Sequence, residues 1–416
     1  MKRLLFSAIP AAAAALLLAS CATTAPPADA PAAKLVSEKA APTAKKPPVD
    51  LEQLAQKLVT QSAGVKEGDI VLISGGAHDV ELLENIAVNV RKAGAFPLID
   101  IGSDRLTKRM FTDVPEKYDS QLNELGMKLA EIADVTINVD SNLTEGLLAD
   151  VDPKRLAARA KAGAPIGEAF RKRNVRSVDV GNGFYPTAWR AARYGMPEDE
   201  LVKTFWEGVN VDYTSLQARG EQVKATLGAG NELHVTDPNG TDLKVRVQGR
   251  PVFVSDGIIS PEDAQKGGAA VNLFLPAGEV YVAPVPGTAE GKVVRPREFY
   301  QGKEIQNLTM TFAGGKLTSL TGSGPGFEKM KAEYDASGEG KDLFAVVDLG
   351  INPNVKLPAA SPVGNWVPAG TITVGVGNNT WAGGDNKVPY GYFISLTGSN
   401  VTLDGRAIIE NGQLKI

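Results

Sequence analysis

From Leu51 to Gly228 the chain alternates between short apolar runs and amphipathic segments. Asp69 to Ile73 is a brief apolar run, and Asp79 to Lys92 then repeats apolar positions at helical spacing. Phe96 to Ile101 is the next apolar run. A strand, a helix and a strand in that order predict a βαβ unit, and hence a parallel sheet covered by helices. The same pattern predicts helices over 51–61, 120–132 and 186–227, a helix starting at Asp152-Pro153, and strands over 135–139 and 175–180.

Beyond Gly228 the pattern changes to short β-type runs separated by turn residues such as Pro238-Asn239-Gly240. The predicted strands cover 233–235, 243–247, 252–254, 280–283, 308–312, 344–347, 372–376 and 392–396. Gly326 to Glu333 is the one convincing helix of this half. We therefore predict an α/β domain over residues 51–228 and a β-rich α+β domain over residues 229–416.

The first 20 residues are predicted to be a lipoprotein signal peptide. Lys2 and Arg3 give the positive start, and an apolar run from Leu4 to Leu18 follows. The run ends in Leu18-Ala19-Ser20-Cys21, which resembles the bacterial lipobox, in which the cysteine is lipidated. The alternative is a transmembrane anchor, which needs about 20 apolar residues and is disfavoured because this run is shorter.

Cys21 is the only cysteine of the chain, as expected if its role is to carry a lipid. The next residue is not Asp, which predicts an outer-membrane lipoprotein facing the periplasm. Residues 22–50 contain nine Ala and six Pro and cannot bury a core, so residues 21–50 are predicted to be an extended tether.

The composition and the short motifs limit which partners and which catalytic mechanisms are plausible for the folded part. The 416 residues carry 44 basic and 48 acidic side chains, and this acidic balance disfavours nucleic acid as a partner. Only two histidines occur, His78 and His234, and we expect a surface or capping role for the first and a packed or edge position for the second. The sequence contains neither a Gly-x-Ser-x-Gly nucleophile elbow nor a His-Glu-x-x-His zinc motif. Ser74-Gly75-Gly76 lacks the spacing of a phosphate-binding loop and is interpreted as a tight turn.

Two acidic residues stand out in the second half. Glu279 follows Gly278 at the start of a predicted strand, and Asp348 precedes Gly350 at the end of another. Acids at strand ends beside glycines leave room for a cation or an amine, although such acids are more often turn formers.

Several short sequence segments of this chain resemble those of the thermophilic metallo-aminopeptidase family, also called aminopeptidase T-like. The shared strings are Tyr185-Pro186-Thr187, Gly195-Met196, Val211-Asp212, Gly240-Thr241-Asp242-Leu243, Gly278-Glu279-Val280, Leu349-Gly350-Ile351-Asn352-Pro353 and Asp404-Gly405. The likeness covers residues 51–416. It implies an α/β first domain, a β-rich catalytic second domain, a two-metal site, release of N-terminal residues from peptides, and a homodimer.

The metal ligands that the resemblance implies are mostly replaced. The family uses two Glu, two His, an Asp and, in some branches, a Tyr. Glu279 matches the first Glu, and Asp348 stands in place of the second. One His position falls on Thr373, and the closing His-x-Asp falls on Gly391 and Phe393. Asp385 is a candidate extra carboxylate.

Two functional hypotheses follow from the resemblance. The first is a lipoprotein with a degenerate metal site that binds peptides or an envelope protein without hydrolysis and needs no cofactor. The second is an active aminopeptidase with a single divalent cation (Zn, Co, Mn or Mg) on Glu279 and Asp348. Ligand counting favours the first. A periplasmic solute-binding protein is disfavoured because the two halves differ too much for similar lobes.

Overall fold

The computed structural model describes residues 45–358 and 361–416. Helix α1 (Leu51–Lys57) begins at Asp50, whose carboxylate accepts a hydrogen bond from the backbone N–H of Gln53. The helix continues directly as η1 (Leu58–Ser62), a π-helical turn. In the described part of the chain, no helix has the length and apolar character needed to cross a membrane.

The first half is built on a five-stranded parallel sheet, which we call sheet A. Its strands run in the order β2-β1-β3-β4-β8. They are β1 (Ile70–Gly76), β2 (Phe96–Gly102), β3 (Val135–Val139), β4 (Arg176–Val180) and β8 (Asn272–Leu275). The predicted βαβ order is confirmed, because α2 (Val80–Lys92) connects β1 to its parallel neighbour β2.

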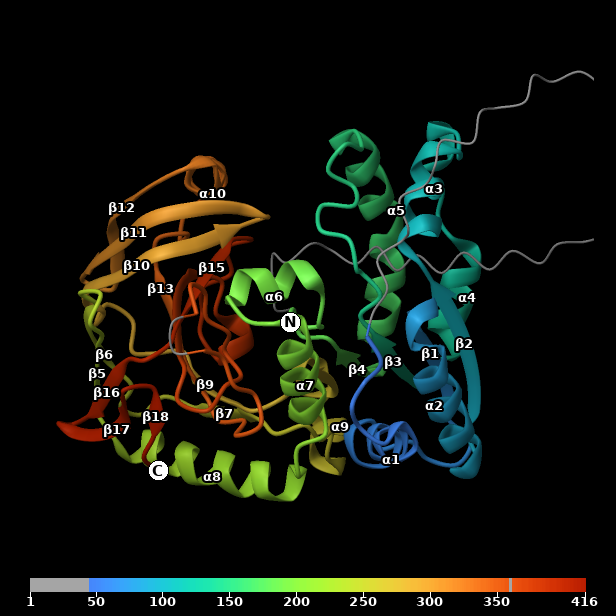
Figure 1. Ribbon diagram of the computed structural model, residues 1–416, viewed down its shortest axis with the longest axis horizontal. Helices are drawn as coiled ribbons and strands as arrows, with labels where there is room; N and C mark the ends of the chain where they lie inside the picture. The colour runs from blue at the N-terminus through green and yellow to red at the C-terminus, as the bar shows by residue number, and fades with distance from the viewer. Residues whose placement is uncertain (1–44, 359–360) are drawn as a thin grey trace, which may run out of the picture.

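Helices cover this sheet and lead to the second half. Helix α2 packs against α1, and α4 packs against α5. The remaining helices of the first half are α3 (Asp104–Thr112), α4 (Glu124–Ile132), α5 (Pro153–Lys172), α6 (Ala188–Tyr194), α7 (Glu198–Val209) and α8 (Tyr213–Ala229), with the short turns η2 (Ala77–Asp79) and η3 (Glu116–Tyr118). In Figure 1, α6 and α7 lie between sheet A on the right and the β-rich part on the left.

The second half contains two antiparallel sheets. Sheet B has the order β12-β11-β10-β6-β5-β16-β17-β18. Its strands are β5 (Glu232–Thr236), β6 (Asp242–Arg246), β10 (Glu290–Tyr300), β11 (Lys303–Ala313), β12 (Lys316–Ser323), β16 (Asn400–Leu403), β17 (Arg406–Glu410) and β18 (Gln413–Leu414). Helix α10 (Pro325–Ala336) packs against β10, β11 and β12, whereas α9 (Pro261–Lys266) and η4 (Gly268–Val271) directly precede β8 of sheet A.

Sheet C carries the acidic residues noted in the sequence. Its order is β15-β14-β13-β9-β7, and all its pairings are antiparallel. The strands are β7 (Val252–Ser255), β9 (Glu279–Val282), β13 (Phe344–Gly350), β14 (Ile372–Gly377) and β15 (Gly391–Leu396), with the turn η5 (Thr380–Ala382) between the last two. The predicted combination of an α/β part and a β-rich part is confirmed.

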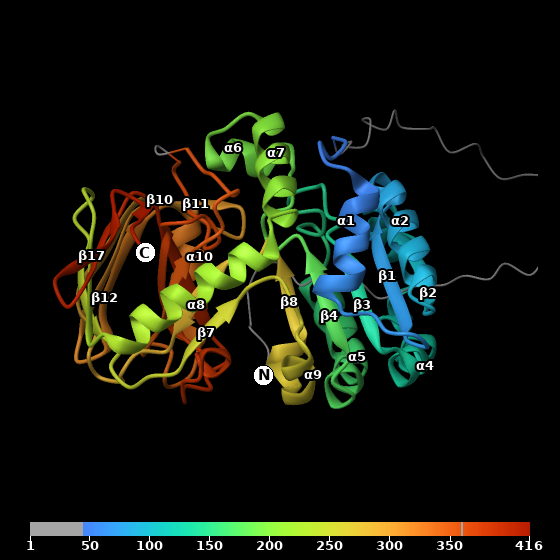
Figure 2. The ribbon, with the colours of Figure 1, turned by 90° about the horizontal axis from the view of Figure 1, so that it is seen from below.

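The connection between the sheets differs from the predicted domain organisation. Strand β8 (yellow in Figure 2) pairs with β4, so sheet A takes a strand from beyond residue 228. The chain then passes from Leu275 through Gly278 straight into β9. A single boundary near residue 228 therefore does not describe sheet A. The sequence pattern did not predict β8, although it predicted the equally short β7 and β9.

Candidate functional site

The strand register of sheet C brings the candidate residues onto one face. Residues opposed in an antiparallel ladder share a face, as do residues two apart along a strand. Glu279 in β9 opposes Gly350 in β13, so Asp348 lies on the same face. Asp348 in turn opposes Thr373 in β14.

The pairing of β14 with β15 adds Gly391 and Phe393 to this face. Gly375 opposes Phe393, and Gly377 opposes Gly391 in β15. Gly375 and Gly377 lie two and four residues after Thr373 in β14, so they share its face. Glu279, Asp348, Thr373, Gly391 and Phe393 are therefore brought together on one face of sheet C, which we call the Glu279 face.

The acids on this face are deeply buried. Glu279 is 1% exposed and Asp348 is 4% exposed. Thr373 is also buried, and its hydroxyl shares a hydrogen bond of 2.8 Å with the hydroxyl of Ser395 on the neighbouring strand. Burying carboxylates is costly without compensation, so such a pair indicates a specific local role.

Asn182 connects the end of sheet A with Glu279. It follows β4 in a Gly-Asn-Gly turn and adopts a positive φ of 45°. Its amide N–H₂ group donates to the Pro276 carbonyl at 2.9 Å and lies 3.5 Å from a carboxylate oxygen of Glu279. The carboxyl ends of parallel strands are a common place for ligand sites, and this contact puts Glu279 beside that edge.

The Phe393 ring fills the space beside two glycines of the Glu279 face. A Cβ atom at Gly375 would lie 2.5 Å from this ring, and one at Gly391 would lie 2.9 Å from it. Both distances are too short for real contacts. The ring therefore occupies the volume that a side chain at position 391 would need.

Three further aromatic rings extend this apolar part of the face. Tyr281 stacks on Phe253 with ring centroids 5.6 Å apart, and Trp381 of η5 lies 5.2 Å from Tyr281. Trp381 also meets Phe393 edge-on at 6.0 Å. All four rings are only partly buried. We call Phe253, Tyr281, Trp381 and Phe393 the aromatic group.

The residues of this face do not fit a two-metal centre. Within residues 45–358 and 361–416, no three His, Cys, Asp or Glu side chains are grouped so that they could hold a metal ion. Imidazole and carboxylate ligands are what such ions need, and aromatic carbon is no substitute. Asp385 is exposed in the loop after η5 and is not part of the strand face.

A second polar cluster lies where β1 ends. The buried Asp79 accepts a hydrogen bond of 2.6 Å from the Tyr185 hydroxyl, and the His78 ring meets the Tyr185 ring edge-on. Burial raises the pKa of the Asp79 carboxyl above its ordinary value, while the Tyr185 hydrogen bond opposes that change. His234 lies in β5, where its Nε2 atom is 2.7 Å from Asp242. These contacts give both histidines structural partners.

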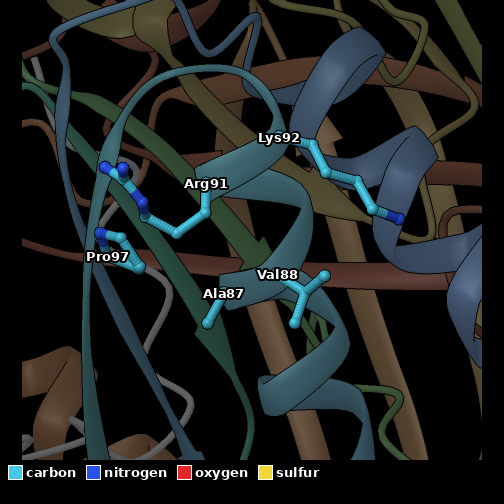
Figure 3. Close-up of a pocket in the computed structure, with 5 residues that line it drawn as sticks. All are labelled: Ala87, Val88, Arg91, Lys92 and Pro97. Atoms are coloured by element: carbon cyan, nitrogen blue, oxygen red, sulfur yellow. The ribbon is translucent and has the colours of Figure 1, made fainter.

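An open hollow of about 530 Å³ lies on the outer side of sheet A (Figure 3). It is lined by Ala87, Val88, Arg91, Lys92 and Pro97. Both cations have partners, since Arg91 donates to the Ala95 carbonyl and Lys92 pairs with Glu52. The lining offers no carboxylate or nucleophile, so the Glu279 face is the better candidate site.

Several strings shared with the family have structural roles. Thr187 caps α6 and Asp212 caps α8 through their side chains. The buried Asn352 donates to the carbonyls of Gly208 and Ala277, which ties α7 to the segment before Glu279. Asp404 accepts from the backbone N–H groups of Asn231 and Glu232. Of these residues, only Asn352 connects the first half with the segment that leads into Glu279.

A fold with an α/β part and a β-rich part that carries acids on one face of a sheet matches the peptidase class suggested by the sequence. The sequence model of the thermophilic metalloprotease (M29) family matches residues 49–325, more than half of the chain, and the chain therefore belongs to this family.

Characterised relatives are aminopeptidases of low sequence identity. Aminopeptidase 2 of Geobacillus stearothermophilus is 23% identical over 319 residues, covering 71% of this chain and 75% of that protein. PepS of Streptococcus thermophilus is 24% identical over 302 residues, covering 65% and 70%. Aminopeptidase T of Thermus thermophilus is 25% identical over 280 residues, covering 61% and 65%.

Two solved structures share the fold. Wild-type AmpT from Thermus thermophilus has a TM-score of 0.63 at 18% identity, covering 88% of this chain and 99% of that one. A 2,5-dihydroxypyridine dioxygenase from Pseudomonas putida KT2440 has a TM-score of 0.55 at 15% identity, covering 88% and 98%. At these identities the likeness shows the fold alone.

Two groups of residues complete the account of the sequence predictions. Cys21, the predicted lipidation site, and most of the predicted tether lie outside the described residues. Neither Asn182 nor the packing of Phe253, Tyr281 and Trp381 beside Phe393 was predicted. A Gly-Asn-Gly turn directly after a strand could have signalled Asn182, whereas the assembly of the rings depends on strand register.

Proposed function

We propose that this protein is a cell-envelope lipoprotein that uses an aminopeptidase fold to bind peptides, or a peptide segment of an envelope protein, without hydrolysing them. One observation carries the proposal. The Phe393 ring fills the space beside Gly375 and Gly391. Position 391 is where the family resemblance places a metal-binding histidine.

The side chains of the Glu279 face support the proposal that the protein does not hydrolyse peptides. Family peptidases need metal-bound water, and two cations need several imidazole or carboxylate donors to replace their hydration shells. This chain offers Glu279 and Asp348 on the face, but Thr373, Gly391 and Phe393 cannot supply those donors. The fold and the buried acids remain, which favours a retained binding role.

The family match covers only the first of the two candidate acids. The matched range ends at residue 325, so it includes Glu279 and stops before Asp348 and the other replaced positions. Fold likeness to a dioxygenase also argues that this architecture is not restricted to peptide hydrolysis.

The second candidate function is an aminopeptidase with one divalent cation. Glu279 and Asp348 are both buried on adjacent strands of one face, and this arrangement favours the one-cation enzyme. Two carboxylates and water would be a sparse set of ligands for a hard cation.

Assays on the full-length protein separate these functions. We expect no release of the reporter group from leucyl or other aminoacyl substrates with added Zn, Co, Mn or Mg, together with calorimetric binding of unmodified peptides. Chelator-sensitive hydrolysis that disappears in Glu279→Ala would contradict the proposal and support the one-cation enzyme. Thr373→His combined with Gly391→His and Phe393→Asp is the matched variant, and it should raise metal occupancy more than activity because supporting contacts are also needed.

The envelope location has its own test. The lipobox predicts that the protein fractionates with outer membranes and is labelled by radioactive palmitate on Cys21. Cys21→Ser should abolish the labelling. Labelling that persists in this variant would contradict the lipoprotein assignment.

A further inference from the structure

We infer that the free edge of strand β2 binds an extended peptide segment of another protein, which adds a strand to sheet A and places an acidic side chain beside Arg91. This edge lies in the first half of the chain, so the inference goes beyond the binding proposed for the Glu279 face. It combines three features: the unpaired backbone of β2, the hollow beside it and the charge of Arg91. In Figure 1, β2 is the strand of sheet A farthest from the β-rich part.

The outer edge of β2 presents backbone groups that suit a partner strand. The N–H group of Phe96 donates to the carbonyl of Asp69, on the side of β1. Because successive residues of a strand point their hydrogen-bonding groups to opposite sides, those of Ile99 and Ile101 point away from β1. Pro97 has the same orientation and carries no N–H group to leave unpaired. Since β2 is the last strand of sheet A, no strand of the described residues pairs with this side.

This edge has little of the usual protection against a further strand. Its pairing with β1 runs without a bulge from Phe96 to Gly102, it contains no lysine or arginine, and Pro97 affects only its first outward position. Phe96 is 55% exposed and Ile101 is 44% exposed. In the described part of the chain, all the exposed large apolar side chains lie between residues 80 and 132. A regular, apolar edge of this kind favours the addition of a strand from a partner.

The hollow of about 530 Å³ lies on the side to which an added strand would point its side chains (Figure 3). Ile101 opposes Gly75, at which a Cβ atom would lie 2.8 Å from Leu83 of α2, so the outward residues of β2 are on the face that α2 covers. Neighbouring strands lie about 4.8 Å apart. An added strand would therefore lie beside the part of α2 where Ala87 and Val88 line the hollow. Its alternate side chains would fill this apolar space.

Arg91 determines the charge of the partner. Its guanidinium group donates to the Ala95 carbonyl at 2.8 Å, and its central carbon lies 5.2 Å from the centre of the Phe96 ring. Neither contact neutralises the positive charge, whereas Lys92, which also lines the hollow, pairs with Glu52. A carboxylate is the partner that an arginine binds most strongly, so the peptide is expected to carry an acid at this point.

A second copy of this chain fits the edge less well. The only acid of β2 is Asp100, which opposes Ser74 and lies on the face away from α2, because it is the neighbour of Ile101 in the strand. If two copies paired their β2 strands antiparallel, the faces would be continuous, and this acid would be on the opposite side of the sheet from Arg91. A peptide that alternates apolar and polar residues and carries an acid toward α2 meets all three requirements.

A capped peptide probe tests the inference on the full-length protein. The probe is acetylated and amidated and has seven residues, as β2 has. It carries threonine at its odd positions, valine at its second and sixth, and glutamate at its fourth, and a comparison peptide has glutamine at the fourth. We expect the glutamate peptide to bind about fivefold more tightly, because it forms a charge-assisted contact. Hydrogen exchange should show that binding protects the N–H groups of Ile99 and Ile101.

Variants locate the binding. Ile101→Pro removes an outward N–H group at an edge position where proline is tolerated, and Ile101→Ala is the matched control because it shortens the side chain but keeps that group. We expect the proline variant to bind the probe about five- to tenfold more weakly than the alanine variant. Val88→Glu puts a like charge beside the acid of the peptide and should weaken binding by about tenfold, whereas Val88→Thr should not. Thermal unfolding checks that each variant is folded, and Val88→Glu carries the test if Ile101→Pro unfolds.

Several results would overturn the inference. These are no binding of the probe, equal binding by the proline and alanine variants, equal binding of the two peptides, or unchanged exchange at Ile99 and Ile101. If the probe did not bind and Ile101→Pro converted a dimer into a monomer in sedimentation, the edge would belong to a second copy. Peptide binding that is lost in Glu279→Gln but unchanged in Val88→Glu would uphold the proposed function and overturn this inference, and the reverse pattern would support this inference alone.

Discussion

The two faces of sheet C are formed by the same five strands but differ completely in chemistry. One face packs toward α8, where Gly220 lies against Val254 of β7, and α8 runs along β7 in Figure 2. Leu349 opposes Val280 and Ile372 on that face, and all three are fully buried. The Glu279 face, in contrast, carries carboxylates, hydroxyls and partly exposed rings.

This difference separates stability from function within a single sheet. The α8 face is an ordinary apolar core, which continues into the core beneath the helices of the first half. The Glu279 face keeps costly buried acids and leaves its rings reachable. Substitutions one residue apart along β13 should therefore have different consequences.

The largest expected effect on stability is on the α8 face. Leu349→Ala should lower the free energy of unfolding by about 2–5 kcal/mol, because it removes buried methyl groups and leaves a cavity. Denaturant unfolding measures the change. A loss of unfolding free energy below about 1 kcal/mol would contradict the view that the α8 face is a tightly packed apolar core.

A histidine at position 391 should reveal the space taken by Phe393. Gly391→His alone should destabilise the protein by about 1–3 kcal/mol, because the new side chain overlaps the ring. Gly391→His with Phe393→Asp should recover most of that loss in the same unfolding measurement. If the single variant is as stable as the unmodified protein, the ring does not fill this volume.

The smallest expected effect concerns the hydroxyl pair of the Glu279 face. Thr373→Val preserves the shape but removes one partner of the Ser395 hydrogen bond, so we expect a loss of about 0.5–1.5 kcal/mol. Ser395→Ala tests the same bond from the other side. A double variant that loses clearly less than the sum would confirm that the two hydroxyls interact.

Much of the fold could be predicted because its strands are marked by local apolar runs. The runs at 344–347 and 372–376 correspond to β13 and β14, and the βα alternation predicted β1, β2, β3 and β4 of sheet A. Helix α3 (Asp104–Thr112) was missed because it is rich in charged residues and buries only Phe111. A local signal was nevertheless present, because Ser103 caps the helix and its hydroxyl accepts a hydrogen bond from the backbone N–H of Leu106.

The site could be predicted only in part. The resemblance located Glu279, Asp348, Thr373, Gly391 and Phe393, but only the strand register shows that they share a face. The contact between Asn182 and Glu279 joins residues 97 positions apart. No local pattern in the sequence encodes such a contact.

The metal content of the unmodified full-length protein tests the central claim most directly. We expect well below one Zn, Co or Mn ion per chain after dialysis against each metal, because Thr373, Gly391 and Phe393 stand where the resemblance places three of the donors. Elemental analysis against protein concentration gives the number, with Glu279→Ala as the comparison. One or two tightly held ions per chain, lost in Glu279→Ala, would contradict the account.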